Sequence, residues 1–285
     1  MASTTTSLND LLPQITAEAM FVANERSIMR GLVKNYSIPA GQGKTITVPR
    51  YPVQSAAVVT EGNEVTDTAV STDGVTLTVA TVAIRTLLTD LARVSSASNV
   101  VADMGRLFGE AIAKKMDQDL LALFSGFATG VGGASTAMSA ALVAQAVARL
   151  RANAVPSDAL ACVVHPFVAY DLKANLSNTF ANPQAGIIQN EAMSTGYVGT
   201  LFGVPVFESA NIADTGTAGD YVGAVFHRDA LGLAMVNDIT IETQRRASFL
   251  GDDIVASAHY AVGELYDTYG VKITADSSLV DPVAP

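Results

Sequence analysis

The clearest hydrophobic pattern in the chain lies in residues 99–124. Apolar residues recur there at three- and four-residue spacing, which is the period of one face of an α-helix. They are Val100, Met104, Leu107, Phe108, Ala111, Ile112, Met116, Leu120, Leu123 and Phe124. Gly126 follows as a helix stop signal. At about 1.5 Å per residue this helix would be roughly 39 Å long, so we expect it to cross a layered or extended body as a spine.

Two segments of period-two alternation precede the spine and enclose a polar stretch. Residues 44–51 alternate as a half-exposed strand does, whereas residues 52–73 are small, polar and acidic. Asp73-Gly74 is a turn signal, and the alternation that follows in residues 75–88 changes phase after Val79, which predicts a bulge. An irregular stretch of this length is uncommon inside a compact domain. We therefore expect a long hairpin that projects from the body and lies on another subunit.

The middle third of the chain alternates helix and strand signals, as an α/β unit does. Residues 129–139 and 211–220 are rich in small or turn-forming residues and are expected to be loops. Helices are predicted at 140–153 and 165–176, and strands at 159–164, 201–208 and 221–226.

The two ends of the chain differ in kind. Residues 7–35 read as an interrupted helical arm, and the last third reads as strands at 238–244, 254–266 and 271–274. The chain is thus predicted to have an α+β fold, with an arm, an extended hairpin, a long helix, an α/β unit and terminal strands.

Charge is scarce in this chain. Only 15% of the 285 residues are charged while 49% are apolar, against about a quarter charged in an average domain. Either much of the surface is buried against other chains, since interface cores are depleted in charge, or the chain is a large Ala-rich monomer. The formal net charge of −10 argues against a surface built to bind nucleic acid phosphates. No apolar run approaches the roughly 18 residues that span a membrane, and no secretory signal is visible.

No catalytic or metal-binding constellation can be assembled from the sequence, so we expect no enzyme activity, cofactor or metal. Residues 41–45 (GQGKT) lack the first glycine of a phosphate-binding loop and precede a strand rather than a helix. The only cysteine, Cys162, lies in an apolar strand and is expected to be core. The three histidines, His165, His227 and His259, are far apart and have no neighbouring ligand at metal spacing.

Two glycines lie one helical turn apart on the spine. Gly105 and Gly109 each cost about 1 kcal/mol relative to alanine inside a helix. Chance is one explanation. The other is a site where a neighbouring element approaches closely or the helix bends.

Three short motifs in the last third of the chain provide evidence beside the order of the predicted elements. They are residues 199–209 (GTLFGVPVFES), residues 226–234 (FHRDALGLA) and Tyr269-Gly270. Each is a weak pattern of hydrophobic residues and glycine. Together with the arm, hairpin, spine, α/β unit and terminal strands, they resemble the HK97-fold major capsid proteins of tailed bacteriophages over about residues 8–275.

This resemblance implies a division of the chain into an N-terminal arm, an E-loop hairpin lying over an adjacent subunit, a peripheral domain with the spine helix, and an axial domain whose loops meet at fivefold and sixfold axes. The corresponding ranges are 1–38 for the arm, 39–92 for the E-loop, 93–134 with 236–285 for the peripheral domain, and 135–235 for the axial domain.

The resemblance also implies residues and partners. The axis loop would include Asn211, Asp214 and Asp220, although residues 129–139 compete for that place. Lys44 is the only lysine in 44–90, so chain cross-linking is not expected. The candidates for contacts between subunits are charged residues of the hairpin and of the C-terminal strands: Arg50, Glu61, Glu64, Asp67, Arg245, Arg246, Asp252 and Asp253. The simpler explanation for such charges is a solvated face or an ion pair within the chain.

As such a protein, the chain would form pentamers and hexamers of an icosahedral head that encloses double-stranded DNA without sequence-specific binding. It would assemble in the host cytoplasm into the virion, with a separate scaffolding protein, a portal and a possible decoration protein, and without a membrane. Three alternatives remain open: an encapsulin-like shell that houses cargo, a stand-alone α/β enzyme built on residues 135–235, and a minor tail or decoration protein.

Overall fold

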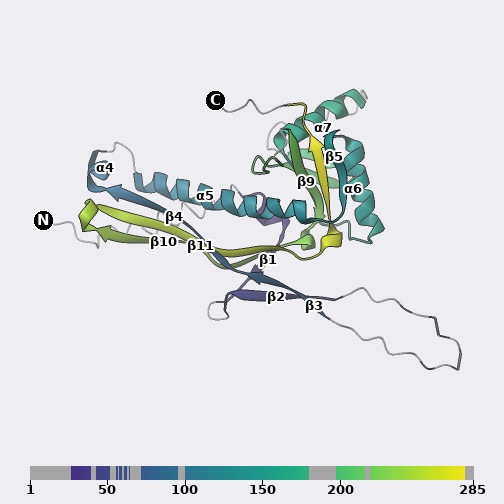
Figure 1. The fold of residues 1–285 in the computed structure, drawn as a ribbon, viewed down its shortest axis with the longest axis horizontal. Coiled ribbons are helices and arrows are strands. Elements are labelled where there is room, and N and C mark those ends of the chain that lie inside the picture. The colour runs from purple at the N-terminus through teal and green to yellow at the C-terminus, as the bar shows by residue number, and fades with distance from the viewer. Residues whose placement is uncertain are drawn as a thin grey trace.

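The computed structural model describes residues 27–39, 43–51, 56, 58–59, 61–62, 64, 72–95, 100–179, 197–215 and 219–279. Their fold is elongated (Figure 1). A long helix, α5 (Val100–Ala122), runs along a four-stranded sheet and ends beside a six-stranded sheet, while a two-stranded sheet projects from the middle. None of the helices in these ranges is long and apolar enough to cross a membrane.

The predicted spine is confirmed as α5, which continues into a 3-10 turn, η1 (Leu123–Gly126). The chain leaves the helix at Gly126, as the stop signal predicts. The buried face consists of Phe108, Ile112, Ala113, Met116, Leu120, Leu121 and Phe124. One member of the predicted stripe, Leu107, is 61% exposed. The buried face is therefore displaced from the predicted stripe, because it leaves out Leu107 and includes Ala113 and Leu121.

The four-stranded sheet has the order β1-β10-β11-β4. Its strands are β1 (Lys34–Ser37), β4 (Ala80–Thr89), β10 (Leu231–Arg246) and β11 (Gly251–Glu264). β1 runs parallel to β10, and the other pairs are antiparallel. Helix α5 covers one face, because the Tyr260 hydroxyl donates to Asp119 of α5 at 2.9 Å. Side chains alternate along a strand, so Ile254, Ala256 and Ala258, all buried, point to that same face.

Smaller elements surround this sheet: helix α3 (Met29–Leu32) before β1, helix α4 (Asp90–Ser95) after β4, and a 3-10 turn, η4 (Ala247–Phe249), between β10 and β11. Met29 and Val33 are fully buried. Of the expected N-terminal arm, residues 1–26 lie outside the described part of the chain.

The base of the expected hairpin is a two-stranded antiparallel sheet of β2 (Thr45–Arg50) and β3 (Asp73–Thr78). The turn predicted at Asp73-Gly74 is wrong, since both residues lie in β3 and Gly74 pairs with Pro49. The phase change after Val79 is not a bulge either. β3 ends there and β4 begins, so the side-chain alternation restarts when the chain passes from the two-stranded to the four-stranded sheet.

The six-stranded sheet has the order β5-β12-β9-β6-β8-β7, with helices α6 and α7 packed against it (Figure 1). The buried residues of α6 are those predicted, and all of β6 is buried. The elements are β5 (Gly130–Ala137), α6 (Ala140–Ala152), β6 (Leu160–Val164), α7 (Pro166–Thr179), β7 (Tyr197–Leu201), β8 (Val204–Glu208), β9 (Asp220–His227) and β12 (Gly270–Asp276).

The loop predicted at residues 129–139 is wrong. Residues Gly130–Ala137 form β5, an edge strand that runs parallel to β12. Glycine, alanine and serine provide no alternation of apolar and polar side chains, so the sequence pattern could not reveal the strand. Gly132 has a positive φ of 77° and lies against the Thr274 carbonyl, where a side chain would collide.

Sheet membership does not follow the expected division of the chain. β12 belongs to the six-stranded sheet although 236–285 was assigned to the spine unit, and β4 belongs to the four-stranded sheet although 39–92 was assigned to the hairpin. The chain crosses between the two large sheets three times. The crossings are η1 with the residues before β5, the 3-10 turn η3 (Arg228–Ala230), and residues 265–269, which include the 3-10 turn η5 (Asp267–Tyr269).

Candidate assembly surfaces

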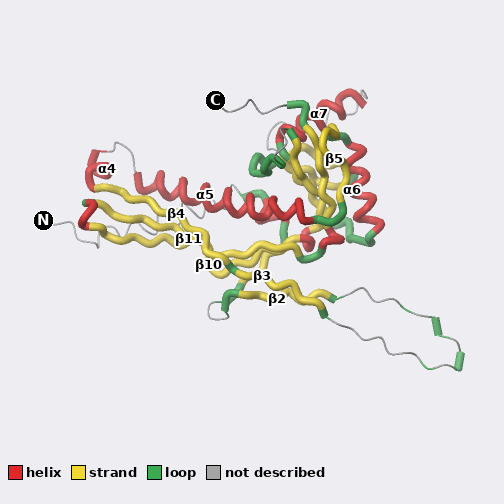
Figure 2. Tube along the Cα trace, in the orientation of Figure 1, coloured by secondary structure: helices red, strands yellow, loops and turns green. Residues whose placement is uncertain are grey.

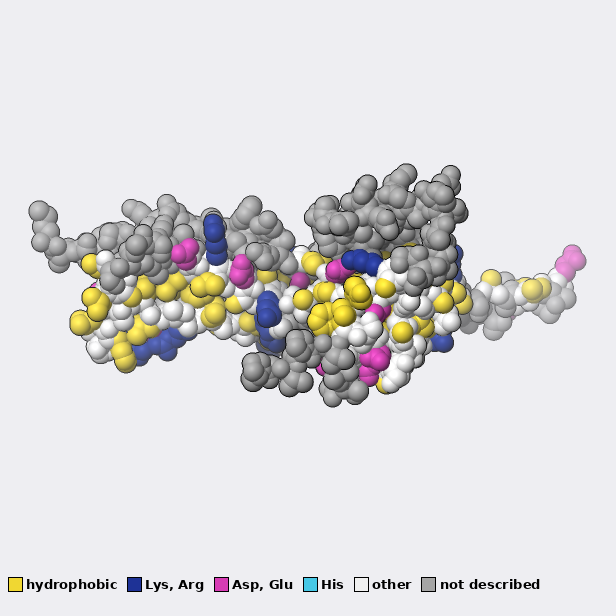
Figure 3. All heavy atoms as spheres, turned by 90° about the horizontal axis from the view of Figure 1, so that it is seen from above, with side chains coloured by type: hydrophobic (Ala, Val, Ile, Leu, Met, Phe, Trp, Pro, Cys, Tyr) yellow, Lys and Arg dark blue, Asp and Glu magenta, His cyan; other side chains and the backbone are white. Residues whose placement is uncertain are grey.

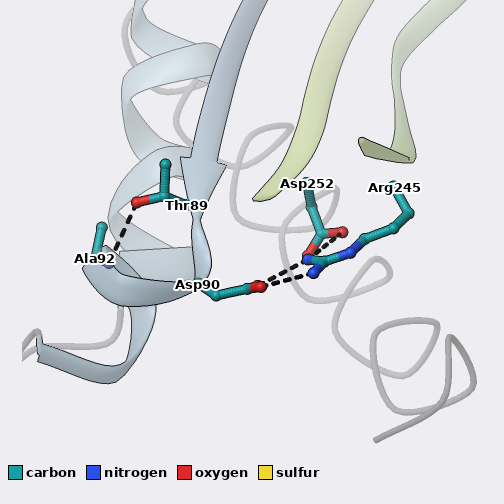
Figure 4. A network of polar contacts seen from close by, with 5 residues as sticks. All are labelled: Thr89, Asp90, Ala92, Arg245 and Asp252. Carbon is teal, nitrogen blue, oxygen red and sulfur yellow. Dashed lines mark hydrogen bonds and ion pairs between the residues drawn. The ribbon is translucent and has the colours of Figure 1, made fainter. Parts of the chain in front are cut away.

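A network of charged residues fixes the end of the four-stranded sheet that lies farthest from the six-stranded sheet. The guanidinium of Arg245 donates to both carboxylate oxygens of Asp90 at 2.7 and 2.6 Å, and it lies 3.4 Å from Asp252 (Figure 4). The hydrogen bond with Asp90 is the main cause that raises the pKa of Arg245. Two of the predicted inter-subunit residues, Arg245 and Asp252, therefore have ion-pair partners within the chain.

The same end displays exposed apolar side chains. Leu91 and Val94 of α4 are 78% and 80% exposed, and Phe249 and Leu250 in the β10–β11 connection are 53% and 69% exposed. Leu250 has a left-handed backbone (φ 46°), and its carbonyl accepts from the Asp90 amide at 2.8 Å. Hydrophobic side chains gather over this end of the molecule in the view from above (Figure 3).

A second charged cluster lies on the face of the four-stranded sheet opposite α5. Asp253 is directly opposite Gln244, and the next pairs along the strands place Glu242 and Arg85 on the same face, beside Val255. One carboxylate oxygen of Asp253, Oδ2, lies 2.8 Å from Arg85 and 3.3 Å from Arg246. These residues line a depression of about 570 Å³.

Asp253 itself is unusual. Its side chain is 8% exposed, and its second oxygen, Oδ1, is buried without accepting a hydrogen bond from the residues that the structure describes. Buried polar atoms almost always have a partner. Of the predicted pair Asp252-Asp253, only Asp253 is thus left with an unused acceptor.

The hairpin carries the remaining predicted contact residues. Glu61 and Glu64 are exposed, Val58 is fully exposed (101%), and the described residues of this loop lie beyond β2 and β3, away from both larger sheets (Figure 2). Asp67 lies outside the described residues. Arg50 stays at the base of the hairpin, where it pairs with Asp73 and donates to a backbone carbonyl at 3.0 Å.

The base of the hairpin meets one of the crossings between the large sheets. Arg50 donates to the Leu265 carbonyl. The carboxylates on either side of Leu265, those of Glu264 and Asp267, interact with each other, and Glu264 lies beside Gly126 at the end of the spine. Asp267 also accepts from the Ala128 amide at 2.7 Å. Burial, and then the neighbouring Asp267 carboxylate, raise the pKa of Glu264, while Arg50 opposes this shift.

The spine glycines lie on its packed side. Gly105 and Gly109 are both buried, and α5 is helical through both positions. Farther along, Asp117 is 1% exposed and accepts from the Ser27 hydroxyl at 2.8 Å and from the Ile28 amide at 3.2 Å. Burial raises the pKa of Asp117, and these hydrogen bonds oppose that shift. Asp117 thereby fastens the segment before β1 to the middle of the spine.

The three residues expected in an axis loop have different environments. Asn211 and Asp214 lie in the connection after β8, where Asp214 forms a bridge with Tyr221. Asp220 is not in the loop. It begins β9, is 3% exposed, and its carboxylate accepts from the Ser135 amide at 3.3 Å.

The cysteine and the histidines, which could act in catalysis or metal binding, have structural surroundings. Cys162 is fully buried, and burial raises the pKa of its thiol to about 12, which keeps it a protonated core residue. His165 stacks on Tyr221 with ring centres 3.8 Å apart, and His259 contacts the Thr81 hydroxyl. Among the described residues, no three potential ligands are grouped in a way that would hold a metal ion.

Sequence reasoning missed several residues of these clusters, among them Arg85, Asp90, Asp117 and Glu264. A charged residue within an apolar pattern was the available signal for Arg85, which interrupts β4, and for Asp117, which interrupts the spine. Asp90 and Glu264 lie at strand ends, where charge is ordinary, so only the fold reveals their partners.

Comparison with known proteins bears on what these surfaces do. A family model described as phage capsid protein matches residues 56–273. The major capsid protein of Staphylococcus phage phiMR11 is 25% identical over 277 residues, covering 96% of this chain and 96% of that protein.

Solved structures from phages share the fold at low identity. The Mycobacterium phage Che8 structure has a TM-score of 0.65 at 24% identity, covering 82% of this chain and 85% of that chain. The acidic stable capsid structure of Helicobacter pylori bacteriophage KHP30 has a TM-score of 0.69 at 9% identity, covering 88% and 91%. Because the family model spans most of the sequence and a curated relative aligns along nearly its whole length, the chain belongs to the phage capsid protein family.

Proposed function

We propose that the chain is the major capsid protein of a tailed phage and that it builds an icosahedral head from pentamers and hexamers of itself. The observation that carries this proposal is the hairpin. The described residues of its loop lie beyond β2 and β3, away from both large sheets, and Val58 among them is fully exposed (Figure 2). Tyr51 and Val59 of the same hairpin are exposed as well, and an extended hairpin with several exposed apolar side chains is suited to contact another copy.

The HK97-like division of the chain is part of the proposal, with boundaries adjusted to the sheets. The peripheral domain comprises α5 and the four-stranded sheet, and the axial domain comprises the six-stranded sheet with α6 and α7. The E-loop comprises β2, β3 and the residues between them. The N-terminal arm is residues 1–33 rather than 1–38, because β1 joins the four-stranded sheet. The axis loop is the connection after β8, with Asn211 and Asp214 but without the buried Asp220.

The charge of the chain supports a container rather than a nucleic-acid binder. A formal charge of −10 allows the protein to surround double-stranded DNA without gripping its phosphates, which keeps the genome free to be packaged and released. A separate scaffolding protein, a portal and a decoration protein are the proposed partners. Assembly takes place in the host cytoplasm, and the role is structural rather than enzymatic.

Electron microscopy and sedimentation of the purified chain test this proposal, with and without the scaffolding protein of the same phage. We expect closed hollow shells of uniform size, and DNA-filled heads of the same lattice in infected cells. A folded chain that remains a single subunit at high concentration beside its scaffold would refute the proposal. Shells that enclose cargo protein and no genome would favour the encapsulin-like alternative.

A further inference from the structure

We propose that Arg50 of the hairpin is a charge latch on the joint between the two large sheets, and that the latch closes when the carboxyl groups of Glu264 and Asp267 ionise. The joint is residues 264–269, which lead from the end of β11 in the four-stranded sheet to β12 in the six-stranded sheet. The latch is internal to a single chain, so it is independent of the proposed function and of assembly.

The root of the hairpin has a small hydrophobic cluster of its own, separate from the main core. Leu77 of β3 packs directly on β11, because a Cβ atom added at Gly263 would lie 2.3 Å from Leu77 Cδ2. Local opening is easiest where few apolar contacts are buried. Polar contacts at the root therefore have a large share in fixing the angle of the hairpin. The buried residues of this cluster are Ile38, Val48, Leu77, Ala234, Ala261 and Leu265.

Arg50, the last residue of β2, reaches from the hairpin to the joint. Its guanidinium donates to the Leu265 carbonyl at 3.0 Å and pairs with Asp73 of β3. It also lies 5.9 Å from the centre of the Tyr266 ring, within the range of a cation–π contact. One side chain thus links both strands of the hairpin to the joint.

Two half-buried carboxylates flank the carbonyl that Arg50 contacts. Asp267 accepts from the Ala128 amide at 2.7 Å, and Oε2 of Glu264 would lie 3.2 Å from a Cβ atom added at Gly126. Both carboxylates therefore reach the same short segment after the spine. Burial raises the pKa of Glu264, the neighbouring Asp267 raises it further, and Arg50 lowers it.

The effect of Arg50 on Glu264 has a reciprocal. Because the nearby guanidinium favours ionisation of Glu264, that ionisation favours the nearby position of the guanidinium by the same free energy. Above the pKa of Glu264, the two carboxylates are like charges at close range, and Arg50 is the cation that offsets them. Below that pKa, protonated Glu264 donates a hydrogen bond to Asp267, so the pair attracts Arg50 less. The hairpin then depends more on its small cluster.

Other charges around the joint have partners of their own. Lys272 donates to a backbone carbonyl at 3.2 Å, and Lys34 pairs with Asp229 at 3.0 Å. Asp267 and Arg50 are the charged neighbours that shift the pKa of Glu264. The remaining titratable or charged groups in contact with the joint or beside it are Lys34, Tyr36, Asp73, His227, Asp229, Tyr266, Tyr269 and Lys272.

Distances between two spin labels test the latch in the unassembled full-length chain. Thr76→Cys on β3 and Arg151→Cys on α6 place labels at exposed positions of the hairpin and of the six-stranded lobe, while the native Cys162 is fully buried. Double electron–electron resonance from pH ~8 to pH ~4 then reports the angle of the hairpin. We expect a narrow distance distribution above the pKa of Glu264 and a broader one below it. The equilibrium between the held and the released hairpin should shift about fivefold or more, as is usual for coupled sites.

Two substitutions assign the response to the latch. Arg50→Gln removes the cation and should give the broad distribution already at neutral pH. Glu264→Gln copies the protonated carboxyl group and should give the same broad distribution at both ends of the pH series. Arg149→Gln is the matched control, because Arg149 of α6 also donates to a backbone carbonyl, that of Gly130, and its loss should leave the wild-type response unchanged.

A wild-type distribution that does not change with pH overturns the latch, and this result needs no substitution. A response that persists in Glu264→Gln also overturns it and assigns the response to another group, such as His227, which contacts Tyr269 of the joint. Neither result touches the proposed function, which fails only if the wild-type chain forms no shells. Melting curves of each variant at each pH confirm that the distributions come from folded chains.

Discussion

Replacing Gly251 by alanine is expected to open the far end of the four-stranded sheet. Gly251 begins β11 directly opposite Thr89 of β4. A Cβ atom at Gly251 would lie 2.6 Å from the Leu88 carbonyl oxygen and 3.0 Å from the Thr89 Cα. Both are backbone atoms, which cannot rotate away as a flexible side chain can. The two strands must therefore separate.

The size of the effect follows from these distances. A carbon atom normally stays about 3.3–3.6 Å from a carbonyl oxygen, so the strands must move apart by roughly 0.7–1 Å. Overpacking of this kind costs about 1–3 kcal/mol. The hydrogen bond from the Asp90 amide to the Leu250 carbonyl spans the same point, and its loss adds about 1 kcal/mol. The total is about 2–4 kcal/mol.

Thermal unfolding followed by circular dichroism measures this cost. A loss of about 2–4 °C per kcal/mol in a chain of this size predicts a melting temperature roughly 4–16 °C below the wild type. Gly31→Ala is the matched control, because Gly31 lies in α3 with no heavy atom within 4 Å of the added carbon. If Gly251→Ala melts together with Gly31→Ala, the strand-separation argument is refuted. Faster amide exchange confined to the α4 end of the sheet would support it.

Three further predictions concern the spine and its ends. Because the pKa of Glu264 is raised in the folded chain, its protonated form stabilises the fold at low pH, and this contribution is lost as pH rises through that pKa. Glu264→Gln should therefore melt above the wild type at neutral pH but not near pH ~4. A pH series of melting curves measures this difference. Asp117→Ala removes the acceptor of two part-buried hydrogen bonds, from the Ser27 hydroxyl and the Ile28 amide. It should lower the free energy of unfolding by about 1–3 kcal/mol in urea titrations, and an unchanged midpoint would contradict the tether. Gly105→Ala with Gly109→Ala should alter shell assembly or expansion seen by electron microscopy, and particles identical to wild type would rule out a functional bend.

Long helices were predictable because their signal repeats. The apolar period continues along the whole spine, which ends at Gly126. In α6, the side chains that the period predicts to be buried are the buried ones. Each additional turn repeats the same information, so single exceptions such as the exposed Leu107 do not disturb the prediction.

Sheet membership was not predictable, since a strand pattern specifies which side chains share a face and not which strand lies beside it. β4 and β12 each lie in a different sheet from the one that their place in the sequence indicated. β5 was missed because an edge strand of small residues has no alternation to read. The candidate surfaces share this limit: Arg85 and Asp253 are far apart in the sequence and meet only through the pairing of β4 with β11.

The placement of exposed apolar residues bears on the two readings of the low charge content. A large monomer scatters single apolar side chains over its surface, but here Leu91, Val94, Phe249 and Leu250 gather at one end. That end is held by the pair between Arg245 and Asp90 and keeps Leu250 in a left-handed conformation, which costs of order 1–3 kcal/mol for a residue with a side chain. A chain that evolved only to be stable would bury Leu250 or replace it with glycine. The exposed position of Leu250 on this apolar end favours the reading in which neighbouring chains cover this surface.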